Sequence, residues 1–485
     1  MLARAVTHAL VGIEARAVEV EAHLQNGVPA FAIVGLPDKA CQEAKERVRS
    51  GITSAELEWP LRRITVNLAP AGLRKEGSGY DLPIALAVLA ASRQVPPERL
   101  AEHAAVGELG LDGRLRPVPG VIVAAEAARR AGLRRLLCPH ESAPEAALAG
   151  IEPVPLRHLA EAGAYLRGRY EPEPVEPAVP PSRNGSGPDL AEVRGQERAR
   201  RALEIAAAGR HNVLLAGPPG TGKTMLARRL PGILPPLTLD EALEVTRIHS
   251  VAGVLPPSRP LVDRPPFRAP HHTASAAAVV GGGPGPRPGE VSLAHRGVLL
   301  LDELPEFHRP VLEALRQPLE DGCVAIARVA GQASFPARFM LVGTMNMCPC
   351  GARGDPSLEC RCSPQKLAAY SAKLSRALLD RFDLVVAMPR SQARELDAPP
   401  GEASGVVRAR VEPAAEAVRE AKPRLGREGR ELLARAVDAL PLSARGRARV
   451  LRAAATVAAL AGAATIEPAH VAEALSYRPP PDLAT

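Results

Sequence analysis

A glycine-rich segment near the middle of the chain has the composition of a phosphate-binding loop. Residues 217–224 complete the pattern G-x-x-x-x-G-K-T, with an apolar segment before it and a helical pattern after it, which is the context that such a loop requires. Its glycines let backbone N–H groups surround a phosphate, Lys223 can reach the β- and γ-phosphates, and the Thr224 hydroxyl can ligate Mg²⁺. The segment therefore predicts a nucleoside-triphosphate site made of Gly217, Pro218, Pro219, Gly220, Thr221, Gly222, Lys223 and Thr224.

Two acids and an amide follow later apolar segments. The run VLLLDE, residues 298–303, ends in Asp302 and Glu303, and FMLVGTMN ends in Asn346. Alone, such residues are surface acids or turn formers. Downstream of a phosphate loop, we expect Asp302 to hold Mg²⁺, Glu303 to polarise the attacking water and Asn346 to orient that water near the γ-phosphate.

Arginines close to apolar runs are further candidates. Arg381 lies in LLDRFDL, and we interpret it as an arginine finger that completes the site of a neighbouring subunit, with a surface ion pair as the alternative. Arg445, Arg449 and Arg452 share one helical face. Most such runs are solvated faces. We expect one of the three to sense the nucleotide, and Arg445 at the helix start is our candidate.

Four of the seven cysteines fall within fifteen residues. Cys348-x-Cys350 and Cys360-x-Cys362 are paired, and the nine residues between the pairs are enough to bring them together. Four thiolates suit a structural Zn²⁺, with free thiols in a loop as the alternative. Cys41, Cys138 and Cys323 are predicted core residues.

The helices and strands expected around these groups fall into three domains. Residues 171–188 contain six prolines and form a predicted linker after an α/β domain at 1–170. Short apolar strands alternating with helices over 189–388 predict a parallel α/β core. A connector at 389–403 leads to a helical segment at 404–485, which we predict to be a lid.

Composition narrows the class of protein. The 485 residues carry a formal net charge of +8, which permits a polyanionic partner without demonstrating one. No apolar run is long enough to cross a membrane, no signal peptide is evident, and the clustered odd number of cysteines argues against a disulfide framework. We expect a soluble cytoplasmic protein. Only twelve residues are aromatic (one Trp, five Tyr and six Phe), so extensive base stacking is not expected.

The order of GPPGTGKT, VLLLDELPEF, GTMN and LLDRFDL resembles that of AAA+ ATPases of the magnesium-chelatase-like branch. Two further segments, VRGQERARRALEIAAAGRHN and PFRAPHHTASAAAVVGGG, narrow the resemblance to the ComM/YifB family across almost the whole chain. It implies ATP, Mg²⁺ and a hexameric ring that acts as a DNA helicase, promoting branch migration during natural transformation. DNA recognition would be independent of sequence and weakened by salt.

The resemblance also gives a meaning to two insertions. Residues 251–290 are rich in Pro and Gly and would project toward the ring pore, where Arg268, His271 and His272 are assigned to DNA or to subunit contact. CVAIARVAGQASFPARF alternates around Gly331 and predicts a hairpin. Similar ATPases carry a pore hairpin at this position, and such a hairpin would direct Arg328 toward a DNA backbone. The alternative is an ordinary sheet edge on which the arginine prevents pairing with other strands.

The N-terminal domain resembles the proteolytic domain of Lon proteases. By that alignment Gly79 occupies the position of the nucleophilic serine, next to Ser78, and Ile122 occupies that of the activating lysine. We therefore expect a module for DNA handling or assembly. A magnesium-chelatase motor subunit, an ATP-dependent protease using Ser78 and a protein-remodelling chaperone remain the alternatives.

Overall fold

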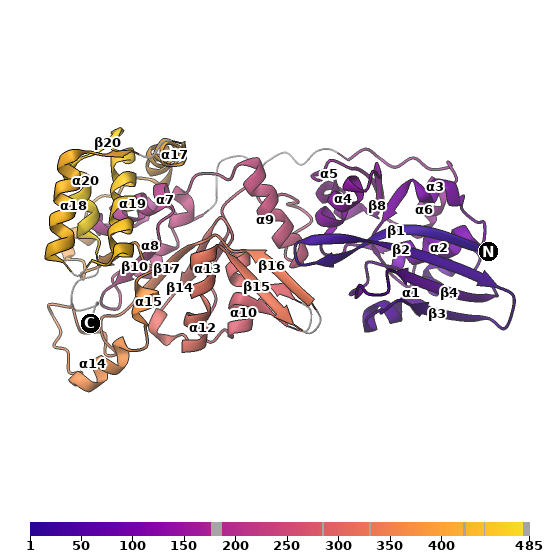
Figure 1. The fold of residues 1–485 in the computed structure, drawn as a ribbon, viewed down its shortest axis with the longest axis horizontal. Helices are drawn as coiled ribbons and strands as arrows, with labels where there is room; N and C mark the ends of the chain where they lie inside the picture. Colours follow the sequence, from indigo (N-terminus) through magenta and orange to yellow (C-terminus); the bar gives the residue numbers. More distant parts are fainter. Residues whose placement is uncertain (176–186, 284–285, 329–330, 421–422, 441, 479–485) are drawn as a thin grey trace.

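The structure, a computed structural model, describes residues 1–175, 187–283, 286–328, 331–420, 423–440 and 442–478. Two α/β bodies lie next to each other along the long axis of the molecule (Figure 1). The N-terminal body ends before the predicted linker, and the second body carries the phosphate loop and the C-terminal helices.

The N-terminal body is built on a seven-stranded sheet in the order β3-β4-β2-β1-β5-β8-β9. Its strands are β1 (Leu2–Val11), β2 (Glu14–Gln25), β3 (Ala30–Val34), β4 (Arg63–Ala69), β5 (His103–Ala105), β8 (Arg135–Pro139) and β9 (Glu152–Leu156). A small ladder joins β6 (Glu108–Leu109) to β7 (Leu115–Arg116), and the helices are α1 (Lys39–Ser54), α2 (Asp81–Ala91), α3 (Pro97–Ala101), α4 (Val121–Arg130), α5 (Ala143–Ala147) and α6 (Leu159–Leu166). Helix α2 has no polar face beyond Asp81 and is buried along its whole length, so it forms the centre of this core.

The second body contains a five-stranded sheet in the order β11-β14-β17-β10-β18, and all four strand pairs are parallel. The strands are β10 (Val213–Ala216), β11 (Phe267–Arg268), β14 (Val298–Leu301), β17 (Met340–Met345) and β18 (Leu384–Ala387). Every residue of β10, β14 and β17 is buried, as expected for a parallel sheet covered on both faces. The edge strand β11 lies inside 251–290, so part of the segment predicted as an insertion belongs to the sheet.

Short helices surround this sheet. They are α7 (Glu197–Gly209), α8 (Lys223–Ala227), α9 (Leu239–Val251), α10 (Ala276–Val280), α11 (Glu290–Leu293), α12 (Arg309–Ala314), α13 (Arg316–Asp321), α14 (Pro364–Ser371), α15 (Arg376–Leu379) and α16 (Ala393–Leu396). Two antiparallel ladders accompany them, β12 (Gly281–Gly282) with β13 (Arg287–Pro288), and β15 (Cys323–Arg328) with β16 (Gly331–Pro336). The β15–β16 ladder confirms the predicted hairpin; the Arg328 side chain lies outside what the structure describes.

The C-terminal segment is helical, as predicted, apart from one two-residue ladder. Its helices are α17 (Ser404–Glu420), α18 (Arg427–Ala439), α19 (Ala444–Leu460) and α20 (Pro468–Ser476). Strand β19 (Arg424–Leu425) pairs in parallel with β20 (Thr465–Ile466). Apolar residues of α17 and α19 share one buried cluster with α7, so the helices are joined to the core. Within the described residues, no helix combines the length and apolar character needed to span a bilayer.

Helix α9 of the second body docks onto α4 of the N-terminal body. Arg247 forms a 2.7 Å ion pair with Glu126. Ser250 Oγ donates a 2.5 Å hydrogen bond to Glu145, whose carboxylate also accepts from the backbone N–H of Ile122 at the start of α4. Burial raises the pKa of Glu145, because these two hydrogen bonds replace only part of its hydration.

Candidate functional site

The phosphate loop connects β10 to α8 at the carboxyl edge of the parallel sheet. Gly220 and Gly222 adopt positive φ angles of +78° and +83°, which side chains with a Cβ rarely adopt. Lys223 is only 9% exposed, and its Nζ donates to the carbonyl oxygens of Gly217 at 2.8 Å and Pro218 at 2.7 Å. Burial lowers the pKa of Lys223, because the charged form of the amine is poorly solvated there. The negative charge of a bound phosphate would offset this effect.

Three hydroxyl and carboxyl groups meet next to this loop. Asp302 Oδ1 accepts a 2.7 Å hydrogen bond from Thr224 Oγ1 and a 2.6 Å hydrogen bond from Thr344 Oγ1. Asp302 lies directly after β14, and Thr344 lies on the neighbouring strand β17. Both predicted magnesium residues, Thr224 and Asp302, are therefore in contact, and oxygen donors are the ligands that Mg²⁺ prefers.

Glu303 occupies a constrained backbone position. Its φ angle is +56°, which is uncommon outside glycine, and its N–H donates a 2.9 Å hydrogen bond to Thr344 Oγ1. The side chain is exposed beside the phosphate loop. Such backbone conformations persist where surrounding contacts hold them, and they cluster at functional sites. Thr344 was not predicted. The signal in the sequence is a single hydroxyl residue within the otherwise apolar strand MLVGTM, and in the structure that side chain is 1% exposed.

Asn346 follows β17 and points at the lysine of the loop. Its Oδ1 lies 3.2 Å from Lys223 Nζ, and its carbonyl accepts a 3.2 Å hydrogen bond from the Tyr370 hydroxyl on α14. The structure thus brings Lys223, Thr224, Asp302, Glu303 and Asn346 to one edge of the sheet. A cavity of about 900 Å³ adjoins the loop beside residues 195–198 at the start of α7 and residues 387–389 at the end of β18. Its size suits the base and ribose of a nucleotide.

Arg381 and Arg445 lie at the other edge of the sheet. They line a cavity of about 600 Å³ together with Asn212, Gly297, Met340 and Asp383, which stand immediately before or at the first residues of β10, β14, β17 and β18. Four residues of strand separate this edge from the phosphate loop, roughly 13 Å. Neither arginine is therefore placed beside the phosphate loop of its own chain.

The other two arginines of the α19 face have acidic partners. Arg452 donates a 2.8 Å hydrogen bond to Asp383, and the Arg449 side chain lies 3.8 Å from the same carboxylate. Asp383 also accepts from the backbone N–H of Asn212 at the start of β10. Burial opposes the charge of Asp383, but the His211 side chain, then Arg452 and the Asn212 N–H, hold its pKa below its usual range. Arg449 and Arg452 thus join α19 to the core.

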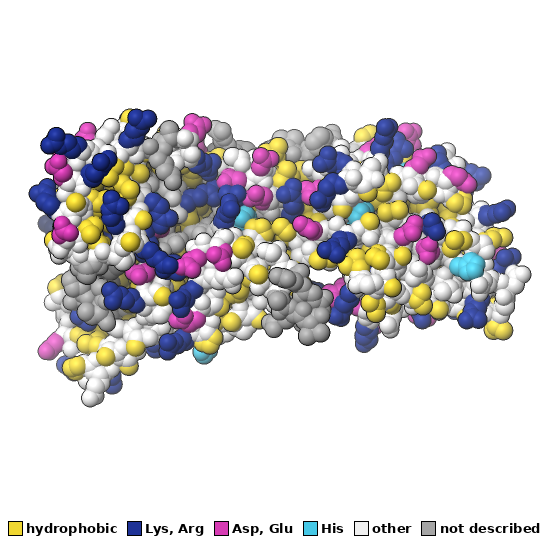
Figure 2. All heavy atoms as spheres, viewed as in Figure 1, with side chains coloured by type: hydrophobic (Ala, Val, Ile, Leu, Met, Phe, Trp, Pro, Cys, Tyr) yellow, Lys and Arg dark blue, Asp and Glu magenta, His cyan; other side chains and the backbone are white. Residues whose placement is uncertain are grey.

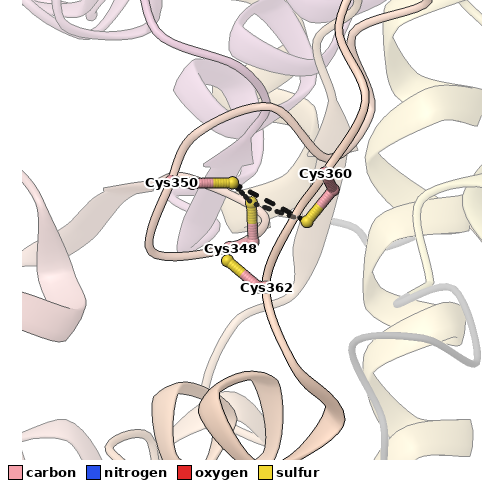
Figure 3. Close-up of side chains that lie close together, drawn as sticks. All are labelled: Cys348, Cys350, Cys360 and Cys362. Carbon is pink, nitrogen blue, oxygen red and sulfur yellow. Dashed lines mark hydrogen bonds between the residues drawn. The ribbon is translucent and has the colours of Figure 1, made fainter.

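The four clustered cysteines converge between β17 and α14 (Figure 3). Their Sγ atoms all lie within 4.8 Å of one another, and Cys348 lies 3.3 Å from Cys350 and 3.6 Å from Cys360. Four thiolates about 2.3 Å from one Zn²⁺ would lie roughly 3.8 Å apart, so this donor set fits a tetrahedral zinc. The loop also touches the phosphate loop: a Cβ added at Gly351 would stand 2.7 Å from Pro219 Cγ. Cys41 and Cys138 are buried, whereas Cys323 is only partly buried.

Other predicted residues lie elsewhere. Arg268 is held by Glu290 in a two-bond ion pair at 2.6 and 2.8 Å, while His271 and His272 stack on each other at 4.1 Å. In the N-terminal body, Ser78 Oγ donates to Glu108, and Ile122 is fully buried. A Cβ at Gly79 would meet Val106 and Val118 at ordinary contact distance. The side chain at the position aligned with the Lon lysine is that of Ile122, which has no group that could act as a base.

The parallel sheet, its phosphate loop, the strand-end acids and the helical C-terminal segment define an AAA+ ATPase of the magnesium-chelatase type. Family profiles described as "Magnesium chelatase, subunit ChlI" and "Magnesium chelatase, subunit ChlI C-terminal" match residues 189–396 and 401–478. A third, "Subunit ChlI of Mg-chelatase", matches residues 20–142. This membership implies the use of ATP and Mg²⁺.

The full-length relatives identify the branch. The chain is 46% identical to an uncharacterized protein of Mycobacterium tuberculosis over 98% of both chains. It is 44% identical to the uncharacterized protein YifB of Salmonella typhimurium over 97% of this chain and 96% of the relative. It is 43% identical to the competence protein ComM of Haemophilus influenzae over 98% of this chain and 97% of the relative. The chain belongs to the ComM/YifB family.

Proposed function

We propose that this protein is an ATP-driven DNA motor that assembles as a ring, with six subunits as the expected number. The observation that carries the proposal is the separation of Lys223 from Arg381 and Arg445 by the length of the sheet. A complete hydrolytic site then requires the phosphate loop of one chain and the arginines of the next. This arrangement couples hydrolysis to the contact between subunits, as a motor requires.

Each residue at the phosphate loop takes one role in hydrolysis. Lys223 binds the β- and γ-phosphates, while Thr224 and Asp302 hold Mg²⁺, which neutralises charge on the phosphate oxygens. Glu303 polarises the attacking water, and Asn346 orients that water from its place beside Lys223. Arg381 of the adjacent subunit supplies positive charge where the γ-phosphate leaves, and Arg445 of that same subunit senses the nucleotide.

DNA is the proposed polyanionic partner. A close relative is named a competence protein, and the net charge of +8 per chain favours a polyanion. On the face drawn in Figure 2, basic side chains are scattered among acidic ones and form no single band. We therefore propose contacts to the DNA backbone, distributed over a ring and insensitive to base sequence. Branch migration during natural transformation is the specific process proposed, and the β15–β16 hairpin is the proposed pore element.

The four-cysteine loop is proposed to hold a structural Zn²⁺. The cysteine sulfurs would supply a closed tetrahedral set, which fixes the loop and does not take part in chemistry. The N-terminal body is proposed as a non-proteolytic module, because Ser78 is paired with Glu108 and a side chain at Gly79 would face Val106 and Val118.

The decisive experiment is ATP-driven branch migration of a four-way DNA junction, comparing wild type with Glu303→Gln. Wild type should separate the junction into duplex products by branch migration, and it should hydrolyse ATP faster when DNA is present. Glu303→Gln should bind ATP and leave the junction intact. Equal junction resolution by the two proteins would refute the mechanism. Hydrolysis that no DNA structure stimulates would instead favour the magnesium-chelatase reading, which the matching family profiles support.

A further inference from the structure

One carboxylate is shared by the two arginines at the amino edge of the sheet. Glu320 Oε1 contacts a terminal nitrogen of Arg381 and lies 3.6 Å from Arg445 Nη1. Arg381 is 8% exposed, and among the described residues its buried Nε has no hydrogen-bond partner. Arg445 is largely exposed and Glu320 is about half exposed. Both arginines that the proposed function places against a neighbour's phosphates are therefore already paired, with the same side chain.

A triphosphate and Glu320 would compete for these arginines. The surrounding cavity is lined by seven arginines and three acids: Arg210, Arg296, Arg338, Arg381, Arg445, Arg449, Arg452, Glu320, Asp321 and Asp383. Asp383 is already paired with Arg449 and Arg452. Glu320 is the acidic partner of Arg381, which lies between α15 and β18, and of Arg445 on α19. A guanidinium binds phosphate through two parallel hydrogen bonds, and a carboxylate repels it, so docking of a phosphate would displace Glu320.

Glu320 is also close in the chain to the hairpin. It lies in the last turn of α13, and only Asp321 and Gly322 separate it from Cys323, the first residue of β15. The backbone N–H of Gly322 donates to Pro318 at 3.0 Å, and its carbonyl accepts from Ala337, just after β16, at 2.8 Å. Both strands of the hairpin are thus fastened to the end of α13. A movement of Glu320 at the end of α13 would therefore also move Gly322, and with it the first residue of β15 and the residue that follows β16.

We propose that Glu320 is a positioning residue that holds Arg381 and Arg445 away from the neighbour's nucleotide and couples their release to the β15–β16 hairpin. This inference rests on the proposed function, because it requires the two arginines to act on an adjacent subunit. Glu320 touches no reacting atom. It sets how readily the arginines engage, and it connects that step to the element proposed to contact DNA.

The test compares wild type with Glu320→Gln, which keeps the side-chain shape and removes the charge. Since Glu320 is half exposed, we expect a modest effect: ATP hydrolysis without DNA should rise about two- to fivefold in kcat. KM for ATP should change less than kcat, because Lys223 and the phosphate loop, which are proposed to bind the nucleotide, are untouched by the substitution. The ratio of hydrolysis rates with and without DNA should fall. Glu320→Asp keeps the charge on a shorter arm and should lie between the two proteins.

Glu313→Gln is the matched control, because Glu313 pairs with Arg316 at 2.8 Å on the adjacent turn and lines neither cavity. It should behave as wild type. Unchanged kcat and unchanged DNA stimulation in Glu320→Gln would overturn the inference. If DNA does not stimulate ATP hydrolysis by wild type, the proposed DNA motor is contradicted. A raised kcat in Glu320→Gln would in that case still support the proposal that Glu320 restrains the two arginines. If Arg381→Ala hydrolyses ATP normally, the arginines have no role to restrain and the inference falls with them.

Discussion

The Thr344 hydroxyl joins the two acids of the site: it donates a 2.6 Å hydrogen bond to Asp302 Oδ1 and accepts one from the backbone N–H of Glu303. A single buried hydroxyl on β17 thereby sets the carboxylate proposed to hold Mg²⁺ and the backbone of the residue proposed to polarise water. The neighbouring strand, and not the acidic segment itself, fixes the geometry of that segment.

Thr344→Val should therefore slow hydrolysis while preserving ATP binding. The substitution keeps the shape of the side chain but removes one hydrogen bond to a charged group and leaves the Glu303 N–H without its partner. A loss of about 1.4–3 kcal/mol, or roughly ten- to a hundredfold in kcat, is expected. Steady-state hydrolysis and binding of a fluorescent ATP analogue measure the two effects. Thr344→Ser retains the hydroxyl and should keep most activity; equal rates for the valine variant and wild type would contradict this role.

Mixing two inactive variants should restore hydrolysis. Because Lys223 and Arg381 lie at opposite sheet edges, Lys223→Ala and Arg381→Ala each damage a different half of a shared site. In a randomly mixed ring, about a quarter of the interfaces pair an intact phosphate loop with an intact arginine. Hydrolysis should return to a comparable fraction of the wild-type rate after the subunits exchange. A mixture as inactive as its components would argue that both residues serve the same chain.

Removing metal from the cysteine loop should weaken nucleotide binding. Gly351 rests on Pro219 of the phosphate loop, so a loosened cysteine loop removes one wall that holds Pro219 in place. Cys360→Ser should lose zinc, measured by elemental mass spectrometry, and its Kd for a fluorescent ATP analogue should rise several-fold, in the range of about 0.5–1.5 kcal/mol. Cys323→Ser, outside the cluster, is the control. An unchanged Kd after verified loss of the metal would contradict the proposed link between the cysteine loop and nucleotide binding. Absence of zinc from the wild-type protein would contradict the proposed zinc site.

The N-terminal body should lose stability in mild acid through His8. Burial, together with the nearby Arg130, lowers the pKa of His8 to about 4, and its Nε2 has no hydrogen-bond partner among the described residues. The unfolded chain takes up a proton near pH 6.5, whereas the folded chain resists it. The free energy of unfolding should therefore fall as pH drops from about 6.5 toward 4, by up to roughly 1.4 kcal/mol per pH unit.

Trp59, the single tryptophan, lies in the N-terminal body and reports this unfolding in urea at pH 7.5 and pH 5. His8→Gln removes the titrating group and should flatten the dependence on pH. An equal pH dependence in wild type and His8→Gln would show that other groups are responsible.

Much of the nucleotide site was predictable, because it is encoded in short segments. The phosphate loop follows its strand directly, and Asp302, Glu303 and Asn346 each follow an apolar run, so a parallel sheet must place them at one edge. The pairing of β15 with β16 was likewise predictable from alternation around Gly331. In contrast, β11 has only two residues and no apolar run, and it is recognisable as a strand only through its pairing with β14.

The order of residues was sufficient to indicate which residues could bind phosphate, which could hold a metal and which family the chain resembles, since those patterns involve neighbours along the chain. Tertiary structure alone decided that Thr344 joins Asp302 to Glu303, that Gly351 rests on Pro219, and that Arg381 and Arg445 share Glu320 at the edge away from the phosphate loop. The physical reason is that spacing along one segment sets local geometry, whereas the edge to which a distant segment is brought depends on strand order and packing across the whole sheet.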